Sequence, residues 1–520
     1  MHIILIALAL QGPMSPRLTA RDSAFHALNR LAYGARPGQA DSVARVGVMR
    51  WIDQQLDPER IPDQHLAERE RQFKILDYDR GDLATRYRDA QRERQRMQRE
   101  MAASGDTTRM QGAGPMREFR ELGGELQQLA IVRAAVSERQ LREVMVDFWT
   151  NHFNVFVGKG ADRFLLPSYI EETIRPRALG RFEDLLIATA QSPAMLFYLD
   201  NAQSVAPGSA PPRQSLSPFR RPRFGRNEMP QDRQRRMPTG INENYVRELL
   251  ELHTLGVDGG YTQQDIIAVA RIFTGWSIER PEQGAGFVFR DWAHDRGTKH
   301  VFGMTFQDDG KTEGIRLLKY LAMSHATMHH VSAKLCARFV ADEPPDGCVD
   351  AAVAAWQRTG GDIRAVLRAI FTSPDFWAPQ AVSNKVKTPF EFVVSAVRAA
   401  GVEPDDTPRL AQLVARLGEP LYQQPAPTGY AETESHWVNS GALLARMNAA
   451  MMIAKQSTSV SDIAGHAELI DAIDRQLLAG TMSAHTRSVI LEQLTDITDP
   501  AQARTMALGF ALGGPDFQRQ

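Results

Sequence analysis

The chain has 520 residues, of which 43% are hydrophobic and 24% are charged, and its formal net charge is -1. A chain of this length can bury a large core. The near-neutral charge argues against a nucleic-acid-binding protein, because binding phosphates requires a surplus of Lys and Arg on one face. The composition is that of a soluble, globular protein.

The N-terminus begins with an apolar run, from Ile3 to Leu10, that is too short to span a bilayer. With the small residues Ala7 and Ala9 before a polar break, it resembles the hydrophobic part of a secretory signal, although a positively charged start is missing. A buried N-terminal strand is the alternative. We expect residues 1–18 to be an export segment, so the protein would be periplasmic or extracellular. No other stretch is long and apolar enough for a membrane helix.

Helical periodicity dominates the first half of the chain. It runs from Ser23 to Leu56, where the sequence YGARPG divides it into two short helices. Residues from about 79 to 101 are strongly charged, which indicates a solvent-exposed helix. From Leu122 to Phe156, apolar residues recur at spacings of three and four, so they share one helix face. The centre of this stripe is formed by Leu141, Val144, Met145, Phe148, Trp149 and His152.

Between Gln203 and Gly240 the composition changes abruptly to Pro and Arg without an apolar period. Such a segment cannot bury enough apolar surface to offset the entropy cost of ordering. We therefore expect a disordered Pro/Arg-rich insertion at 203–240. Its arginines could bind an anionic partner, but a solvated insertion is the favoured interpretation.

The segment INENYVRELLELHTLGVDGGYTQQDI, residues 241–266, predicts a helix that Asn242 caps and that Gly256 ends in the left-handed conformation. Thr262 and Asp265 match a capping box for the next helix. After it, two alternating phenylalanines, a turn near 295–297 and the sequence KHVFG predict one short β-hairpin. Helices dominate again to the C-terminus. The predicted fold is mainly α, a large multi-helix single domain over residues 19–515.

The two cysteines, Cys336 and Cys348, are too few for a disulfide scaffold. Cys336 lies within the helical pattern SAKLCARFVA, which favours a buried and unreactive thiol. A disulfide between them stays open if the protein is exported. Their spacing does not fit a zinc ribbon.

His253 lies in the middle of the apolar face of its predicted helix, at about 100° per residue. Glu248 and Glu251 fall on the opposite side. One straight helix therefore cannot bring all three side chains to a single atom, which excludes the simplest Glu/His metal motif. His253 should be buried, and its ring needs partners from elsewhere in the chain.

His152 also completes an apolar stripe, so the two rings could meet inside a bundle. The favoured interpretation makes each a neutral core ring bonded to a backbone carbonyl, because lone buried histidines are more often structural than catalytic. The alternative is a buried polar or metal site assembled from several helices. Glu248 and Glu251 would line a different face, where an ion-pair network with arginines is at least as favoured.

The sequence HDRGTKH is a second candidate cluster. His294, Asp295 and Lys299 place a base, a carboxylate and a cation in one short span, although Asp and Gly are also what a tight turn requires. Because only one helix separates this span from His253, we expect the two histidines to lie close together, with a carboxylate from Glu248, Glu251 or Asp295 beside them. The chain has no GxSxG, HExxH or dinucleotide fingerprint.

Several motifs, in order along the chain, resemble the bacterial domain-of-unknown-function 1800 family: LNRLAYGARPG, FWTNHF, YLDNAQS, NENYVRELLELHTLGVDGGYTQQDI, ARIFTGWS, HDRGTKHVFG and HWVNSGALLARMN. The resemblance implies a large, mostly helical and commonly exported domain, but no established reaction. It also implies a frequent genomic neighbour of the domain-of-unknown-function 1501 family, which resembles alkaline phosphatases and sulfatases. The family usually has His-Pro-Ala-Thr where this chain has residues 324–327, Ser-His-Ala-Thr, which weakens any role for that position. The family's recurrent polar positions fall on Asn151, His152, Asn242, Glu243, Asn244, Arg247, Glu248, Glu251, His253, His294, Asp295, Lys299 and Trp437.

Two functions follow as hypotheses. The first is an exported hydrolytic or metal-dependent enzyme, whose site could bind a divalent metal. The second is a non-catalytic partner or assembly factor for a neighbouring exported phosphatase/sulfatase-like protein. An enzyme requires the candidate residues to converge on a cleft, whereas their scatter through the core would favour the partner. The candidate catalytic residues are His253, His294, Asp295, Glu248, Glu251 and His152.

Overall fold

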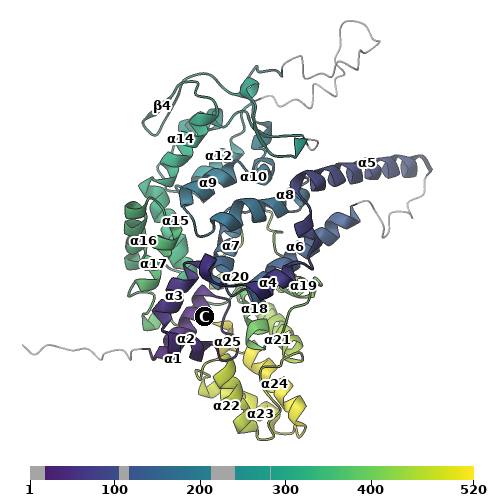
Figure 1. The fold of residues 1–520 in the computed structure, drawn as a ribbon, viewed down its shortest axis with the longest axis vertical. Coiled ribbons are helices and arrows are strands. Elements are labelled where there is room, and N and C mark those ends of the chain that lie inside the picture. Colours follow the sequence, from purple (N-terminus) through teal and green to yellow (C-terminus); the bar gives the residue numbers. More distant parts are fainter. Residues whose placement is uncertain (1–17, 105–115, 212–239, 281–282) are drawn as a thin grey trace, which may run out of the picture.

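The computed structural model describes residues 18–104, 116–211, 240–280 and 283–520. Helices build an elongated body, from which one long helix, α5 (Arg80–Ser104), projects as an arm (Figure 1). The expected mainly α fold is confirmed. Within these ranges, no helix combines the length and the apolar character needed to cross a membrane.

Up to residue 211, the remaining α-helices are α1 (Ala20–Leu31), α2 (Gln39–Val46), α3 (Val48–Gln55), α4 (Gln64–Glu70), α6 (Arg117–Val136), α7 (Gln140–His152), α8 (Asp162–Ser168), α9 (Phe182–Ala190) and α10 (Pro193–Tyr198). A π-helical turn, η4 (Tyr169–Ile174), follows α8.

From residue 240 onwards, the α-helices are α12 (Asn244–Glu248), α13 (Gln263–Ile272), α14 (Lys311–Ala322), α15 (His325–Phe339), α16 (Asp346–Thr359), α17 (Ile363–Thr372), α18 (Pro389–Ala399), α19 (Arg409–Arg416), α20 (Glu434–Trp437), α21 (Ser440–Ala454), α22 (His466–Leu477), α23 (Ala484–Leu494), α24 (Pro500–Gly513) and α25 (Pro515–Gln518). The π-helical segment η8 (Leu249–His253) continues α12.

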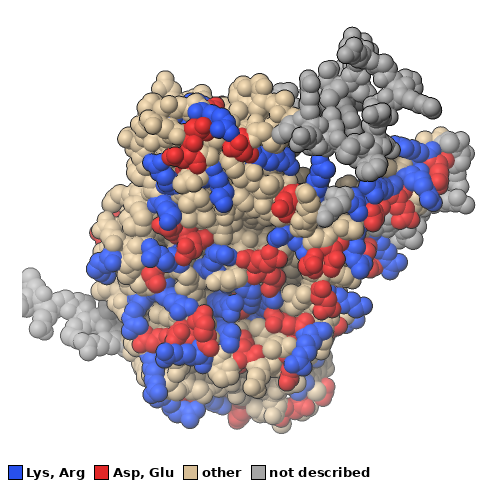
Figure 2. Space-filling model, turned by 45° about the horizontal axis from the view of Figure 1, so that its top comes forward, with Lys and Arg blue, Asp and Glu red and all other residues tan. Residues whose placement is uncertain are grey.

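Helix α7 lies at the centre of the body (Figure 1), where it contacts α1, α3, α6 and η4. Its apolar stripe explains this position, since Val144, Met145 and Trp149 are completely buried. Helices α15 to α17 form one flank, and α21 to α24 form the end of the body opposite α9 and α14. Acidic and basic side chains intermix over the face shown in Figure 2, in keeping with the near-neutral net charge.

The N-terminal helices follow the sequence pattern with one difference. Thr19 and Asp22 form a capping box that starts α1. The second predicted helix is two helices, α2 and α3, because Gly47 has a φ of 97° and interrupts them. That backbone conformation is readily adopted only by glycine. The charged helix expected near residues 79–101 is α5.

The β-structure consists of two small antiparallel pairs, β1 (Trp276–Ile278) with β2 (Phe287–Phe289), and β3 (Lys299–Val301) with β4 (Met304–Phe306). The sequence indicated the strands β2 and β3 but paired them with each other in one hairpin. Each instead pairs with a neighbour of three residues, which is too short to give an alternating signal. The β3–β4 turn has positive φ at both Phe302 and Gly303, as a tight two-residue hairpin requires.

Part of the expected insertion at 203–240 packs against the body. Ser204 and Val205 are buried, the Val205 amide donates to the Gly240 carbonyl at 3.1 Å, and the Ala206 amide donates to the Ala293 carbonyl at 2.8 Å. The rest of that expected insertion, 212–239, and residues 1–17 of the expected export segment lie outside the described residues.

Cys336 of α15 and Cys348 of α16 form a disulfide, with their Cα atoms 6.2 Å apart. The favoured interpretation of an unreactive free thiol at Cys336 is therefore wrong, and the alternative of a disulfide is correct. It joins two neighbouring helices at one flank of the body (Figure 1).

Candidate functional site

The candidate site lies where α7 meets the Pro-rich loop of residues 417–433. Asn151 and Tyr430 exchange two hydrogen bonds: the Asn151 side chain donates to the Tyr430 carbonyl at 2.9 Å and accepts from the Tyr430 amide at 2.7 Å. One turn further on, the Asn154 side chain donates to the carbonyls of Gln424 and Ala426. These bonds fix an irregular loop against a regular helix.

Gly429 allows this close approach. Its φ is 72°, and a Cβ added to it would lie 2.4 Å from the Asn151 carbonyl oxygen. A side chain there would push the loop away from α7.

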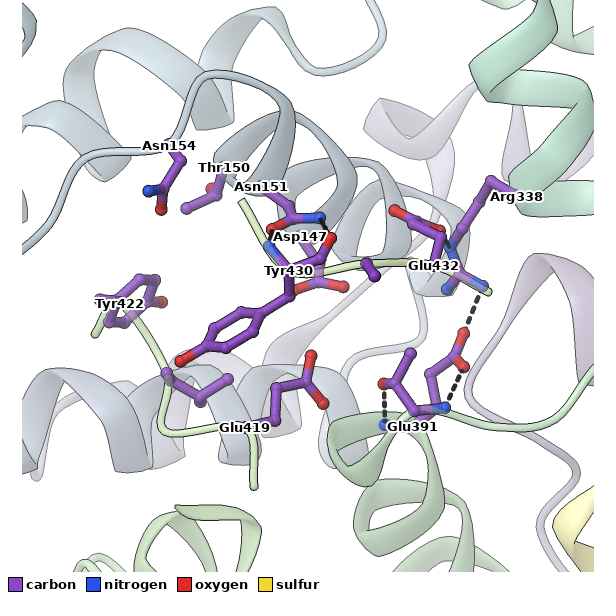
Figure 3. Close-up of a pocket in the computed structure, with 13 residues that line it drawn as sticks. Asp147, Thr150, Asn151, Asn154, Arg338, Glu391, Glu419, Tyr422, Tyr430 and Glu432 are labelled. Atoms are coloured by element: carbon purple, nitrogen blue, oxygen red, sulfur yellow. Dashed lines mark hydrogen bonds and ion pairs between the residues drawn. The ribbon is translucent and has the colours of Figure 1, made fainter. Parts of the chain in front are cut away.

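A polar cavity of about 50 Å³ remains between the helix and the loop (Figure 3). Since one water needs roughly 10–15 Å³ of such space, the cavity has room for about three to five waters. Its wall is formed by Asp147, Thr150, Asn151, Asn154, Arg338, Thr388, Glu391, Glu419, Leu421, Tyr422, Tyr430, Ala431 and Glu432.

Asp147 projects from α7 into this cavity without a partner. Within the described ranges its carboxyl group makes no hydrogen bond or ion pair, and the surface that protein atoms leave open faces the cavity. Burial raises the pKa of Asp147 to about 7; the charge of Arg338 opposes the shift, and Glu432 and Glu391 add to it. Asp147 is therefore poised to gain or lose a proton near neutral pH.

Glu419 enters the same cavity from the loop (Figure 3). Its carboxyl group accepts a hydrogen bond from the Phe390 amide at 2.8 Å, and it also interacts with the Thr388 side chain. Burial raises the pKa of Glu419 to about 8, and the charge of Asp147 is the next contribution. The charge of Asp147 thus disfavours ionisation of Glu419, as one carboxylate does to another that shares its site.

Arg338 of α15 and Glu391 of α18 form a buried ion pair at the other end of the cavity. Glu391 also accepts hydrogen bonds from the Thr388 amide at 2.8 Å and from the Gln520 side chain at 3.0 Å. Burial alone would raise the pKa of Glu391, but Arg338 and these donors outweigh burial and lower it. Glu391 therefore stays ionised, whereas the pKa values of Asp147 and Glu419 beside it are raised.

A second cavity, of about 40 Å³, lies on the other side of Asp147. It shares Asp147, Thr150, Leu421 and Tyr422 with the first. The Tyr33 hydroxyl borders it and is buried without a hydrogen-bond partner among the described residues. Asp147 thus lines both small cavities.

The two histidines on apolar faces meet, as expected. His152 and His253 are each 2% exposed, and their ring centroids are 6.1 Å apart. The His152 Nε2 lies 3.2 Å from the His253 carbonyl oxygen, so it donates to that oxygen. Burial, followed by the charge of Lys334, lowers the pKa of His253 to about 3 and that of His152 well below its ordinary value. Both rings are neutral, and their predicted burial is confirmed.

Glu248 and Glu251 lie away from this pair and are half-buried. Burial raises the pKa of Glu248, with a smaller contribution from Glu251. In the described part of the chain neither forms an ion pair. Arg247, the nearest arginine in sequence, pairs with Glu243 instead.

His294 and Asp295 belong to a separate buried network. The Lys299 ammonium pairs with Glu313 at 2.7 Å, and the His294 Nε2 lies 3.5 Å from the same carboxylate. Asp295 accepts two hydrogen bonds from Arg271, each of 2.9 Å. Burial would raise the pKa of Asp295, but Arg271 and the Gly297 amide outweigh it and lower the pKa.

The structure thus brings His152 and His253 together and places His294 and Asp295 elsewhere. The interactions of His253 involve α7 and α15, whereas those of His294 involve Thr274, β2, β3 and α14, and the two sets share no residue. The expected contact between His253 and His294 is not among them. Catalytic roles for these residues stay predictions. Across the described ranges, no three His, Cys, Asp or Glu residues are grouped so that they could hold a metal ion.

Sequence reasoning missed the residues of the cavity. Asp147 and Asn151 lie four residues apart on α7, so they share one face of the helix, and Asn154 follows three residues later, just beyond the end of α7. This spacing was the available signal in the sequence. Glu391, Glu419 and Arg338 gave no such signal, because acids at a helix start or in a loop, and an arginine in the last turn of a helix, are normally solvated.

Comparison with known proteins gives one match. No curated protein and no solved structure matches the chain. The model of the family described as Protein of unknown function (DUF1800) matches residues 26–519. The match includes α7, α15, α18 and the 417–433 loop, so every element of the cavity lies within the family's domain. The chain belongs to the DUF1800 family.

Proposed function

We propose that the protein is an exported hydrolytic enzyme that uses Asp147 and Glu419 as its acid–base pair. The observation that supports this best is the presence, in one cavity, of two carboxyl groups whose pKa values are raised to about 7 and about 8. General acid–base catalysis is most effective when the pKa lies near the working pH. Pairs of titratable groups with shifted pKa values are typical of active sites, although structural networks also produce them.

In this mechanism the ionised Asp147 takes a proton from a water molecule in the cavity. The water oxygen attacks the electrophilic atom of the substrate, and the bond to the leaving group breaks. Protonated Glu419 donates its proton to the leaving group, so the proton that Asp147 gains balances the one that Glu419 loses. Arg338 is held by Glu391, and its charge faces the negative charge that develops in the transition state.

This assignment predicts a bell-shaped pH profile. Activity rises as Asp147 ionises through pH 7 and falls as Glu419 ionises above about pH 8. The test is a screen of chromogenic carboxylic esters, phosphate esters, sulfate esters and glycosides with the wild-type protein, D147N and E419Q. At least a hundredfold loss in both variants, with unchanged circular dichroism, is the expected result. Turnover that survives in D147N, or no turnover of any class by the wild type, would contradict the proposal.

The disulfide supports the exported location. Disulfides persist in oxidising compartments and are rare where thiols are kept reduced, and this protein joins its two cysteines, Cys336 and Cys348. Residues 1–18 fused to a reporter that is active only after export should make the reporter active. A reporter that stays inactive would overturn this part of the proposal.

A non-catalytic partner role is the second candidate, and one surface favours it. Val438, Leu443, Leu444 and Met452, from α21 and the residue after α20, expose 38% to 65% of their surface. Exposed apolar side chains are typical of protein interfaces where they adjoin one another. The occupant would be a phosphatase/sulfatase-like protein of the domain-of-unknown-function 1501 family. Co-expression of the two proteins followed by size-exclusion chromatography tests this role. The wild type should co-elute with the phosphatase/sulfatase-like protein, and L444E should abolish the co-elution if these side chains bind that protein.

A further inference from the structure

A larger cleft lies on the outer side of the Asp147 cavities. It holds about 610 Å³, within the range of small-molecule sites, whereas the two inner cavities have room for only a few waters. Its walls come from α4, α6, the first turn of α7 and η4. A substrate larger than the inner cavities can therefore reach Asp147 only if most of it stays in a space such as this cleft.

The cleft adjoins the inner cavities directly. It shares Arg133, Glu143 and Arg175 with the cavity on the outer side of Asp147. That cavity in turn shares Asp147 and Thr150 with the polar cavity of Glu419. The side chains of one ion pair, Glu143 with Arg175, thus stand between the cleft and Asp147.

The acidic groups of the cleft are all engaged. Glu70 and Glu171 both pair with Arg133, and Glu143 pairs with Arg175. Asp63 accepts hydrogen bonds from the Ser137 hydroxyl at 2.6 Å and from the Glu138 amide at 3.0 Å.

Two arginines of the cleft are not engaged by acids. The Arg139 side chain donates to one backbone carbonyl, that of Ile61, at 2.9 Å. Arg142 makes no hydrogen bond or ion pair with any described residue, although it is half-buried. Burial lowers the pKa of Arg142, and the charges of Arg175 and Arg139 lower it further, while Glu143 opposes them. Four arginines and four acids line the cleft. Their numbers are equal, but two of the arginines have no acidic partner in the described structure.

We propose that this cleft binds an oxyanion of the substrate, a carboxylate, sulfate or phosphate group, through Arg142 with help from Arg139. A guanidinium group matches the geometry of such an anion because it offers parallel N–H donors. An oxyanion also relieves the repulsion between Arg142 and its like-charged neighbours. This inference rests on the proposed acid–base function: the anionic group is held in the cleft while the reacting bond reaches Asp147.

Binding is measured by isothermal titration calorimetry of the full chain with sulfate, phosphate and acetate, at constant ionic strength in chloride. The wild type is expected to bind at least one of these anions saturably, and R142Q at least tenfold more weakly. R139Q is a second variant, expected to show a smaller loss. R358Q is the matched control, because Arg358 is an exposed arginine of α16 outside the cleft, and it should bind like the wild type.

D147N separates this inference from the proposed function. It should bind the anion normally, because Asp147 does not line the cleft, and it should lose activity. Absence of saturable binding by the wild type, or equal binding by R142Q and R358Q, would overturn the oxyanion site and leave the roles of Asp147 and Glu419 standing. Normal binding with full activity in D147N would instead overturn the proposed function alone.

Discussion

At Asp147, the cost of burying a carboxylate sets how stability depends on pH. The unfolded chain ionises this group near its ordinary value of 3.8, whereas the folded protein holds the proton until about pH 7. Between these values the folded state binds more protons, so the contribution of Asp147 to stability falls as pH rises and is fully unfavourable above pH 7. The difference between the two pKa values corresponds to a loss of folding stability of at most on the order of 4 kcal/mol.

D147N removes this penalty. We predict that its free energy of unfolding, relative to the wild type, increases as pH rises from 4 to 8, and urea titrations at several pH values measure the difference. A difference that does not change with pH would contradict the raised pKa of Asp147.

The buried pair of His152 and His253 differs from Asp147, because neither ring changes its charge near pH 7. Both rings are already neutral at pH 7, and His152 is bonded to a backbone carbonyl, which fits a role in packing. We predict that H253Q lowers stability by about 1–3 kcal/mol and keeps activity within a few-fold of the wild type. If His253 were catalytic, as the sequence suggested, H253Q would instead lose its activity. Abolished activity in a folded H253Q protein would therefore support a catalytic role for His253.

Among the elements, the Lys299–Glu313 pair anchors β3 to α14. Both side chains are completely buried, so removing one leaves an uncompensated charge in the core. We predict that K299M lowers the free energy of unfolding by about 3–5 kcal/mol, measured by urea denaturation. The double variant K299M/E313Q should recover part of this loss, because neither charge then remains. Equal stability of the single and double variants would show that the cost is one of packing.

The disulfide acts on α15, the helix that contributes Arg338 to the cavity. It closes a loop of 12 residues between α15 and α16. We predict that C336S/C348S lowers stability by about 3 kcal/mol, because the unfolded chain regains the entropy that this loop restricts. Thermal denaturation with and without a reductant measures the effect. A melting temperature that neither the variant nor the reductant changes would show that the bond contributes nothing to stability.

For the whole molecule, the sequence predicted local features and missed those that depend on distant segments. The capping box at Thr262, and the burial of His152 and His253, follow from residues within one or two turns of a helix, and the structure confirms them. The α-helical spacing of 100° per residue placed His253 on the buried face correctly, although η8 is π-helical. The five residues of η8 are too few for the wider π-helical turn to move the side chain to another face.

The cavity could not be predicted in this way. Asp147, Arg338, Glu391 and Glu419 come from α7, α15, α18 and a loop that are far apart in the sequence. Their raised or lowered pKa values arise from burial and from each other's charge, and neither is a property of any one segment. The partner that His294 does have, Glu313, was missed for a related reason: it follows two short strands whose pairing the sequence did not reveal.

The central claim is that Asp147 and Glu419 each gain and lose a proton near neutral pH. The most direct measurement is a pH titration of the side-chain carboxyl ¹³C signals in protein labelled at Asp and Glu, with D147N and E419Q identifying the two resonances. We predict midpoints near pH 7 for the Asp147 signal and near pH 8 for the Glu419 signal, with the Glu419 midpoint lowered in D147N because the neighbouring charge is gone. Midpoints near pH 4 for both groups, unchanged in either variant, would contradict the acid–base pair.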